Sequence, residues 1–160
     1  MSACQQHVEM YRSLTEMNGL VMPNIQLLSE FGRQWTPKRN KLTGKMEPGR
    51  CYKNAYQLVA SNPDKYVYCE GFAMSPGLIP LEHAWVVDRH GHAIDPTWDK
   101  GADYFGVAFD FFWLMDFCSD TGYYGVMGML YTLRKQDVYA KLKSGIDTRL
   151  HAQSIAQEQK

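Results

Sequence analysis

The chain has 160 residues, 45% of them hydrophobic, which is enough for one buried core and too little for two domains. Its 17 basic and 17 acidic residues cancel, which removes a global electrostatic reason to expect a nucleic-acid or anionic-membrane partner. The N-terminus lacks the pattern of a signal peptide, and no segment approaches the roughly 20 apolar residues that span a bilayer. We therefore expect a soluble, cytoplasmic protein with no nucleic-acid or membrane partner.

Two helices are expected before residue 32. Apolar residues recur at three-residue spacing from Cys4 to Met17, and Asn18-Gly19 ends that pattern. Pro23 is suited to open a second helix, which continues to Phe31. The polar, basic segment Thr36–Pro48, with its prolines and glycine, predicts a loop.

The next segment predicts a helix that begins at Cys51. Its apolar positions fall on one face, and the helix is expected to end before Asn62-Pro63. Tyr66–Ala73 is rich in aromatic and β-branched residues and predicts a strand. Chain order therefore places a cysteine at a helix N-terminus directly before a sheet.

The stretch EHAWVVDRHGHAIDPTW predicts a β-hairpin with strands His83–Asp88 and His92–Asp95. If the turn lies between them, residues whose numbers sum to about 181 or 182 face each other. Asp95 then lies about three residues short of the partner of His83. A diagonal contact or a bulge still brings the imidazole and the carboxylate within reach.

The C-terminal third is expected to be mainly helical. Phe109–Cys118 is apolar nearly all round, which favours a buried helix, and Lys135–Lys143 also predicts a helix. Gly125–Leu133 fits either a strand or a helix. We expect one domain over residues 1–145 and a polar tail over residues 146–160 that frays.

Cys51, His83 and Asp95 form the strongest candidate for chemistry. A thiolate is favoured at a helix N-terminus or beside an imidazolium, and Cys51 meets the first condition. A catalytic histidine also needs a third group that holds its tautomer and orientation. His83 and Asp95, at the two ends of one hairpin, suit these roles. The other cysteines (Cys4, Cys69 and Cys118) are too sparse for a disulfide scaffold and are interpreted as thiols.

Three motifs carry a resemblance to a known group of enzymes. They are GRCYKNA (Gly49–Ala55), HAWVVD (His83–Asp88) and DPTW (Asp95–Trp98). Their order resembles that of the papain-like and transglutaminase-like superfamily of cysteine enzymes. The His-x-Trp followed by Asp-Pro is most similar to the transglutaminase-like core, whose members include transglutaminases, peptidases, deglycosylating amidases and acyltransferases.

The resemblance implies an α+β fold in which the cysteine-bearing helix packs on an antiparallel sheet. It assigns Cys51 as nucleophile, His83 as general base and acid, and Asp95 as the group that orients the imidazole. It implies a cysteine hydrolase or acyltransferase, such as a thiol protease, amidase or deamidase. The substrate would be a protein, a peptide or a small amide or ester. No cofactor is expected, and the oligomeric state, like the choice between hydrolysis and acyl transfer, stays open.

The chain departs from papain-like proteases where those enzymes place their oxyanion-stabilising glutamine, since Lys45 stands six residues before Cys51. The oxyanion hole is therefore expected to use the Cys51 backbone N–H and a second donor. Candidates for that donor are Asn54, Gln34 and Trp35.

Glu70 and Trp85 are further candidates for contact with a substrate. In an extended strand Glu70 points to the face opposite Cys69, which makes it either an exposed carboxylate, the interpretation that we favour, or a neighbour of His83 in one cleft. Trp85 lies two residues after His83 and shares its strand face.

Other interpretations remain. A zinc site built from Cys51, Cys69, His83 and His92 would lack C-x-x-C or H-x-x-x-H spacing, so no metal is expected. His90 and His92 flank a turn glycine and are expected to face solvent.

The main alternative function is a catalytically inactive binding or inhibitory module. It would have the same fold and use the aromatic segment Tyr104–Tyr131 as its contact surface. A structural or accessory role also stays open.

Overall fold

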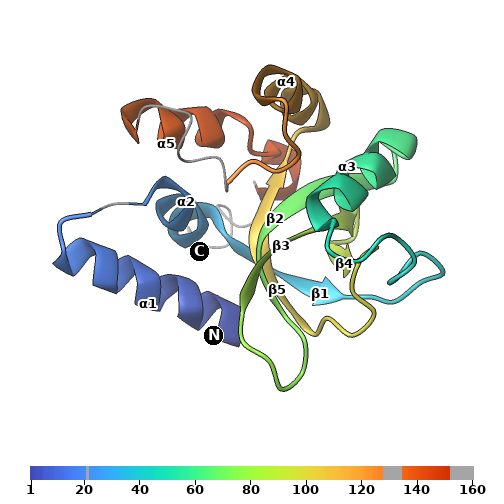
Figure 1. Cartoon of the computed structure of the whole chain (residues 1–160), viewed down its shortest axis with the longest axis horizontal. Coiled ribbons are helices and arrows are strands. Elements are labelled where there is room, and N and C mark those ends of the chain that lie inside the picture. The colour runs from blue at the N-terminus through green and yellow to red at the C-terminus, as the bar shows by residue number, and fades with distance from the viewer. Residues whose placement is uncertain (21, 128–134, 152–160) are drawn as a thin grey trace.

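The computed structural model describes residues 1–20, 22–127 and 135–151 and shows a mixed α+β fold (Figure 1). Five strands close into a barrel in the order β1-β4-β3-β2-β5, and helices surround it. The elements in chain order are α1 (Ala3–Met17), α2 (Pro23–Phe31), β1 (Arg33–Pro37), α3 (Cys51–Ser61), β2 (Tyr66–Met74), β3 (Leu81–Asp88), β4 (His92–Ile94), β5 (Asp103–Phe109), α4 (Phe111–Thr121) and α5 (Lys135–Ser144).

The barrel is mostly antiparallel. β2 pairs along its length with β3 on one side and β5 on the other, and β1 closes the ring by pairing antiparallel to β5 and parallel to β4. The parallel pair differs from the purely antiparallel sheet that we expected. The predictions for α1, α2, α3, β2, α5 and the β3–β4 hairpin are confirmed within a few residues.

β1 and β5 were not predicted. β1 is five residues long with only its central residue buried, so it shows no clear alternation. β5 is buried at every position, so it has no polar face to mark a period of two. The aromatic segment from Tyr104 was expected to offer a contact surface, but its first six residues lie inside the fold, and residues 128–131 lie outside the described residues.

The barrel interior is filled by side chains from alternate positions of the strands. The buried members of this interior cluster are Trp35, Cys69, Ala73, Trp85, Val87, Ala93, Tyr104 and Ala108. A Cβ on Gly106 would lie 2.7 Å from the Trp85 ring and 2.4 Å from the carbonyl oxygen of Glu70. Glycine at this position therefore lets β5 approach β2 while a tryptophan fills the space between them.

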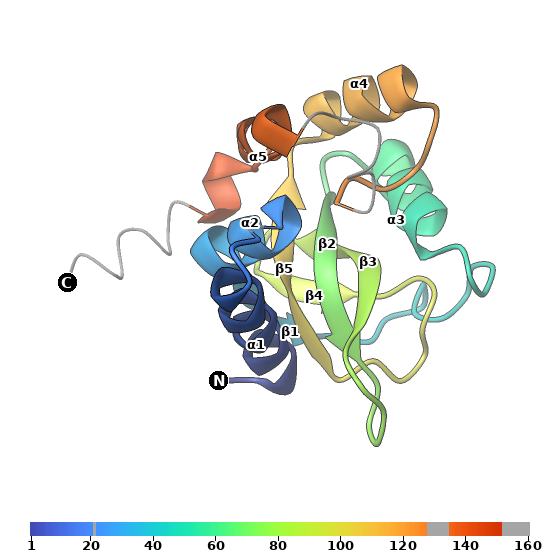
Figure 2. The same ribbon diagram turned by 60° about the vertical axis from the view of Figure 1, so that its left-hand side comes forward.

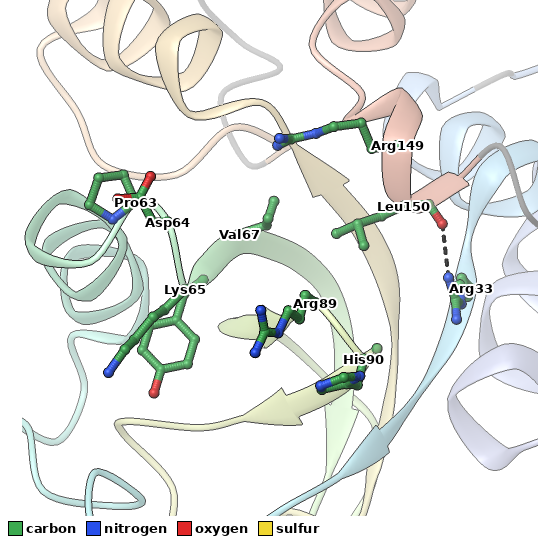
Figure 3. A pocket seen from close by; sticks show the side chains of 11 residues that line it. Arg33, Pro63, Asp64, Lys65, Val67, Arg89, His90, Arg149 and Leu150 are labelled. Atoms are coloured by element: carbon green, nitrogen blue, oxygen red, sulfur yellow. Dashed lines mark hydrogen bonds between the residues drawn. The ribbon is translucent and has the colours of Figure 1, made fainter.

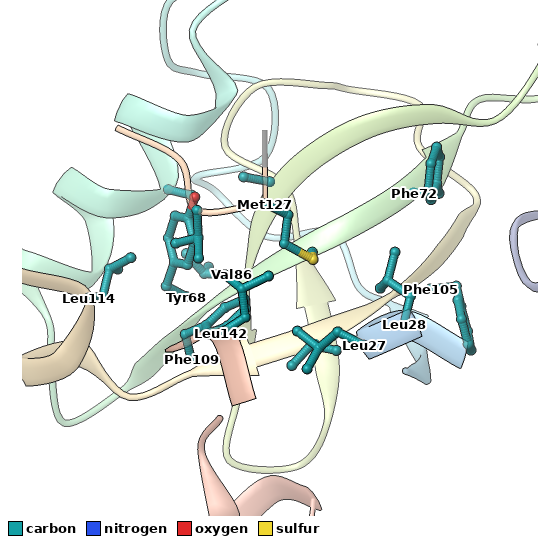
Figure 4. Close-up of a cluster of buried hydrophobic side chains, with 14 of the residues drawn as sticks. Leu27, Leu28, Tyr68, Phe72, Val86, Phe105, Phe109, Leu114, Met127 and Leu142 are labelled. Carbon is teal, nitrogen blue, oxygen red and sulfur yellow. The ribbon is translucent and has the colours of Figure 1, made fainter. Parts of the chain in front are cut away.

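A larger core lies between the outer face of the sheet and the helices (Figure 4). α2 contributes Leu27 and Leu28, α4 contributes Leu114, and α5 contributes Leu142. Figure 2 shows α3 on one flank of the barrel and α1 and α2 on another. The alternation of strand side chains thus supplies two cores, one inside the barrel and one beneath the helices.

α4 and the C-terminal segment both differ from expectation. α4 was predicted as a buried helix, but only Leu114 and Phe117 are buried and Phe112 is 71% exposed, so it lies on the surface.

The tail predicted from residue 146 is attached to the barrel at its beginning, because the Asp147 N–H donates to the Ala108 carbonyl at 2.9 Å. His151 is buried as well, while residues 152–160 lie outside the described residues, as does part of the ambiguous segment 125–133. None of the described helices is both long and apolar enough to cross a membrane.

Candidate active site

The site forms where β3 has no partner on one side. β4 pairs with β3 only at Val86 and Val87, so the first half of β3 is open on that side. α3 packs on β2 and β3 and begins beside this opening. The hairpin was expected to pair residues whose numbers sum to about 181 or 182. The observed pairs are Val86 with Ile94 and Val87 with Ala93, and the residue numbers of each pair sum to 180. The chain leaves the sheet after Ile94, directly before Asp95.

The loop before α3 is bonded to the segment that carries Asp95. The Gly44 N–H donates to the Asp95 carbonyl at 2.9 Å, and the Met46 N–H donates to the Pro96 carbonyl at 2.8 Å. From α3 itself, the Asn54 amide donates to the Thr97 hydroxyl at 2.9 Å. These contacts fix the start of α3, and therefore Cys51, relative to the carboxylate.

His83 and Asp95 form a buried pair. The His83 Nε2 and Asp95 Oδ2 atoms are 2.8 Å apart, and the two side chains are only 2% and 3% exposed. Because an ionised carboxylate can only accept, Nε2–H is the donor and Nδ1 is left for another partner. The diagonal contact expected from the hairpin is present.

Asp95 is held by three further donors. Its Oδ1 accepts the backbone N–H groups of Thr97 at 2.9 Å and Trp98 at 3.0 Å, and its Oδ2 accepts the Tyr104 hydroxyl at 2.8 Å. Hydrogen bonds to the charged form stabilise a buried carboxylate. The DPTW motif therefore builds the turn that orients Asp95, and β5 adds Tyr104 from across the barrel.

The imidazole of His83 stacks on an aromatic ring, that of Trp98. The Trp98 ring stacks on it with centroids 3.8 Å apart and planes 20° apart, and the Trp85 ring lies 6.3 Å away on the same strand face. Trp85 is fully buried, so it acts as a wall of the barrel interior and does not face a substrate directly. The stacking restricts rotation of the ring about its side-chain bonds, which preserves the bond to Asp95.

The electrostatics favour a charged imidazole. Burial by itself lowers the pKa of His83, but hydrogen bonds to Asp95 and to the Cys51 side chain, together with their negative charges, raise it to about 9. Cys51 is half-buried at the first position of α3, near enough to His83 to be one of the two groups that raise the pKa of its imidazole. An imidazolium beside a thiol at a helix N-terminus is the environment in which a thiolate is stabilised.

The other cysteines lie in different surroundings. Burial, assisted by neighbouring Asp103, raises the pKa of Cys4 to about 12, and burial raises that of Cys118 to about 11. Cys69 is fully buried inside the barrel, as its strand phase indicated, and burial raises its pKa well above the usual range. Cys51 is the one thiol of the described structure in contact with an imidazole that carries a carboxylate partner.

Each of the three predicted oxyanion donors makes a hydrogen bond elsewhere in the described structure. Asn54 donates to the Glu47 carbonyl at 2.8 Å and to Thr97, and it supports the loop before α3. Gln34 donates to Asp103 at 2.8 Å, and the Trp35 indole donates to the Gly106 carbonyl at 3.1 Å inside the barrel. All three side chains therefore have structural contacts.

The first turn of α3 offers the backbone N–H of Cys51, which was expected as a donor, and that of Tyr52, which was not named from the sequence. Its N-cap, Arg50, makes no side-chain capping bond. The first helical hydrogen bond runs from the Asn54 N–H to the Arg50 carbonyl, and within the described residues the N–H groups of Cys51 and Tyr52 have no acceptor. Unsatisfied N–H groups at a helix start attract negative charge.

Glu70 does not belong to this cluster. It is 2% exposed, which corrects the expectation of an exposed carboxylate, and it lies on the outer face of the sheet, whereas His83 faces inward. It accepts hydrogen bonds from the Tyr68 hydroxyl at 2.5 Å and from the backbone N–H groups of Val126 at 2.5 Å and Met127 at 2.9 Å. Burial raises its pKa to about 7, against the opposing effect of these donors. Its role is to anchor the segment that follows α4.

The turn histidines are also accounted for in part. His92 does not face solvent freely, because its Nδ1 lies 3.1 Å from Oδ2 of Asp88. The other oxygen, Oδ1, accepts the backbone N–H groups of His90 and His92. His90 is exposed. The described residues hold no cluster of three or more His, Cys, Asp or Glu side chains that could bind a metal ion.

Tyr104 and Trp98 are the site residues that sequence reasoning did not assign. Trp98 stands in the DPTW motif directly after the Asp95 turn, so its position beside the pair could have been anticipated. Tyr104 lies in a strand without a visible period, and only closure of the barrel brings its hydroxyl to Asp95. No protein-family model, curated protein or solved structure gives a significant match to this chain.

Proposed function

We propose that the protein is a thiol-dependent hydrolase or acyltransferase of the transglutaminase-like or papain-like kind. The observation that carries the proposal is the buried His83–Asp95 pair, 2.8 Å between Nε2 and Oδ2, with Cys51 at the first residue of α3 and among the groups that raise the pKa of the same imidazole. Three side chains distant in sequence share one contact network. Their roles as nucleophile, base and orienting group match the general logic of catalytic triads.

The reaction proceeds in two stages. His83 takes the thiol proton of Cys51, and the thiolate attacks the carbonyl carbon of an amide or ester to form a tetrahedral intermediate. The imidazolium then gives its proton to the departing amine or alcohol, which leaves a thioester on Cys51. Water, or a second amine, then gives a proton to His83 and attacks the thioester carbonyl. The C–S bond breaks, an acid or a new amide is released, and the proton on His83 is shared again with the Cys51 thiolate.

The oxyanion of the intermediate would be stabilised by backbone groups. The N–H groups of Cys51 and Tyr52 have no acceptor among the described residues and lie at the positive end of the α3 dipole. Backbone donors aimed at developing charge supply a large part of catalysis in acyl transfer. This arrangement replaces the side-chain donor expected from Asn54, Gln34 or Trp35.

An apolar groove beside the triad favours a substrate with an apolar acyl group. It runs between the β2–β3 connection and the segment 97–100, and Trp98 is its wall toward His83. Its exposed aliphatic side chains are Leu78 at 63%, Ile79 at 71% and Leu81 at 45% exposure. Exposed apolar side chains that gather beside a candidate catalytic residue are typical of a substrate-binding groove.

Alkylation of the thiols by iodoacetamide, followed residue by residue with mass spectrometry, tests the proposal. At pH 7 we expect Cys51 to react at least about tenfold faster than Cys118, which is also half-buried but has its pKa raised to about 11. His83→Gln should slow alkylation of Cys51 about tenfold or more and leave the rate of Cys118 unchanged, while thermal unfolding checks that the variant still folds. Equal rates for Cys51 and Cys118 in the folded wild type would refute the proposal.

A further inference from the structure

A second cavity lies at the other end of the barrel, on the side of the β3–β4 turn (Figure 3). Its volume is about 580 Å³, within the range of small-molecule sites. It is lined by Arg33, Pro63, Asp64, Lys65, Tyr66, Val67, Arg89, His90, Gly91, Arg149 and Leu150. Tyr66 pairs with Asp88, five residues along β3 from His83, so about 16 Å of strand separates this cavity from the triad.

The side chains around this cavity are predominantly basic. The wall has four basic side chains and one carboxylate, that of Asp64. The basic residues are Arg33, Lys65, Arg89 and Arg149. Of the four, Arg149 is already paired, since its Nη2 lies 2.8 Å from Asp147. Within the described residues the other three basic side chains form no ion pair. In a chain whose total charge is zero, this concentration of positive charge is local.

Arg33 is held in place without a carboxylate. Its guanidinium lies over the Trp35 ring, 4.6 Å from the centroid, and its Nη1 donates to the Leu150 carbonyl at 2.8 Å, as the dashed line in Figure 3 marks. These contacts use one face and one donor of a group that has five N–H donors in a fixed fork. The remaining donors belong to a partly buried charge at the cavity wall, an environment that suits an anion.

The cavity also has apolar surface. Val67 and Leu150 lie between the basic groups in Figure 3, and Pro63 and Tyr66 also line the cavity. A cavity with several basic side chains on its wall and an adjacent apolar surface suits a ligand that has a dianionic group attached to an apolar body. A bare carboxylate would use fewer of the available donors than a phosphate, which has three terminal oxygens.

We propose that this cavity binds a small phosphomonoester with an aromatic or apolar body, through Arg33, Lys65 and Arg89. The proposal does not depend on the function of Cys51, because the filled barrel separates the two sites. The adjoining hollow lined by Lys38, Lys65 and Arg89 offers room for an extension of the same ligand. The phosphate would contact the basic side chains, and the body of the ligand would lie over Val67 and Leu150.

Isothermal titration calorimetry with adenosine monophosphate, inorganic phosphate and adenosine tests the site on the full-length chain. We expect adenosine monophosphate to bind most tightly, phosphate more weakly and adenosine weakest. Lys65→Gln and Arg89→Gln, both at exposed positions, should each weaken binding of adenosine monophosphate about tenfold, as expected for the loss of a charge-assisted hydrogen bond. Lys141→Gln on α5 removes the same charge elsewhere and should leave the affinity unchanged.

Three results would overturn the proposal. They are equal affinity for adenosine and its monophosphate, equal loss in the Lys141→Gln control, and binding of a single-stranded oligonucleotide without measurable binding of the monophosphate. Cys51→Ala should bind the monophosphate like the wild type. A change in that variant would contradict the separation of the two sites.

Discussion

Replacement of Asp95 by asparagine removes the charge that maintains the imidazolium of His83. Burial alone lowers the pKa of His83, and the hydrogen bond to Asp95 is the first cause that raises it to about 9, followed by the bond to Cys51 and the charges of both groups. In Asp95→Asn we therefore expect the pKa of His83 to fall to its ordinary value of 6.5 or below. At about 1.4 kcal/mol per pKa unit, this is a loss of about 3 kcal/mol in stabilisation of the imidazolium. At pH 7.5 the ring would change from mostly charged to mostly neutral.

The assay is the rate of Cys51 alkylation measured from pH 5 to pH 10. In the wild type the His83 proton is retained below about pH 9. The enhancement of the Cys51 rate over that of an ordinary thiol should therefore extend across neutral pH and disappear above about pH 9. In Asp95→Asn the enhancement should be lost by about pH 7, with a decrease of tenfold or more at pH 7.5. Tyr104→Phe is the matched control, since it removes a neutral donor from the same carboxylate oxygen and keeps the charge. An unchanged pH profile in folded Asp95→Asn would refute the reasoning.

Three further substitutions test the structure around the site. Asn54→Ala removes the donor to Glu47 and Thr97, so we expect a loss of about 1–3 kcal/mol in the free energy of unfolding by urea and slower alkylation of Cys51. Gly106→Ala places a Cβ 2.4 Å from the carbonyl oxygen of Glu70, so urea unfolding should show a loss of about 3 kcal/mol or more. The third substitution is His151→Gln. Nε2 of His151 accepts the Ala108 N–H at 3.0 Å, and burial, with a smaller contribution from the charge of Arg33, lowers the pKa of this imidazole to about 4.

The sign of the His151 effect follows from proton binding. Its pKa is lower in the folded than in the unfolded state, so the stability that it contributes is present above pH 6.5 and is lost as the pH falls toward 4. Between pH 7 and pH 5 the wild type should lose about 2 kcal/mol more than His151→Gln, measured by urea unfolding. Comparison with the variant cancels the opposite contribution of Glu70, whose raised pKa of about 7 favours the folded state at lower pH.

Each of these results has a contrary outcome. Full stability of Gly106→Ala would show that β5 and β2 are not in close contact. An Asn54→Ala protein with unchanged thiol reactivity would show that the loop before α3 does not position Cys51. Parallel pH curves for the wild type and His151→Gln would place the residue 151 imidazole in solvent.

Local signals in the sequence were sufficient for the helices and for the hairpin. The face of α3, the proline that opens α2 and the turn between β3 and β4 are encoded within a few residues, so each was recognised with boundaries close to those observed. The same local order placed Cys51 at a helix start and His83 and Asp95 at the ends of one hairpin. The order of these residues and the DPTW turn were therefore readable without a structure.

Closure of the barrel was decided only by tertiary contacts. β5 is buried on both faces, so its sequence shows no alternation, and β1 exposes all but its centre, so neither strand carries a pattern of its own. Pairing of β5 with β2 brings Tyr104 to Asp95, and bonds from the loop before α3 bring Cys51 to His83. Contacts of this kind join residues tens of positions apart, and their free energy comes from burial and hydrogen bonding in the assembled fold. A local sequence pattern therefore indicates which residues are available for a site, while the packing of the chain determines which of them meet.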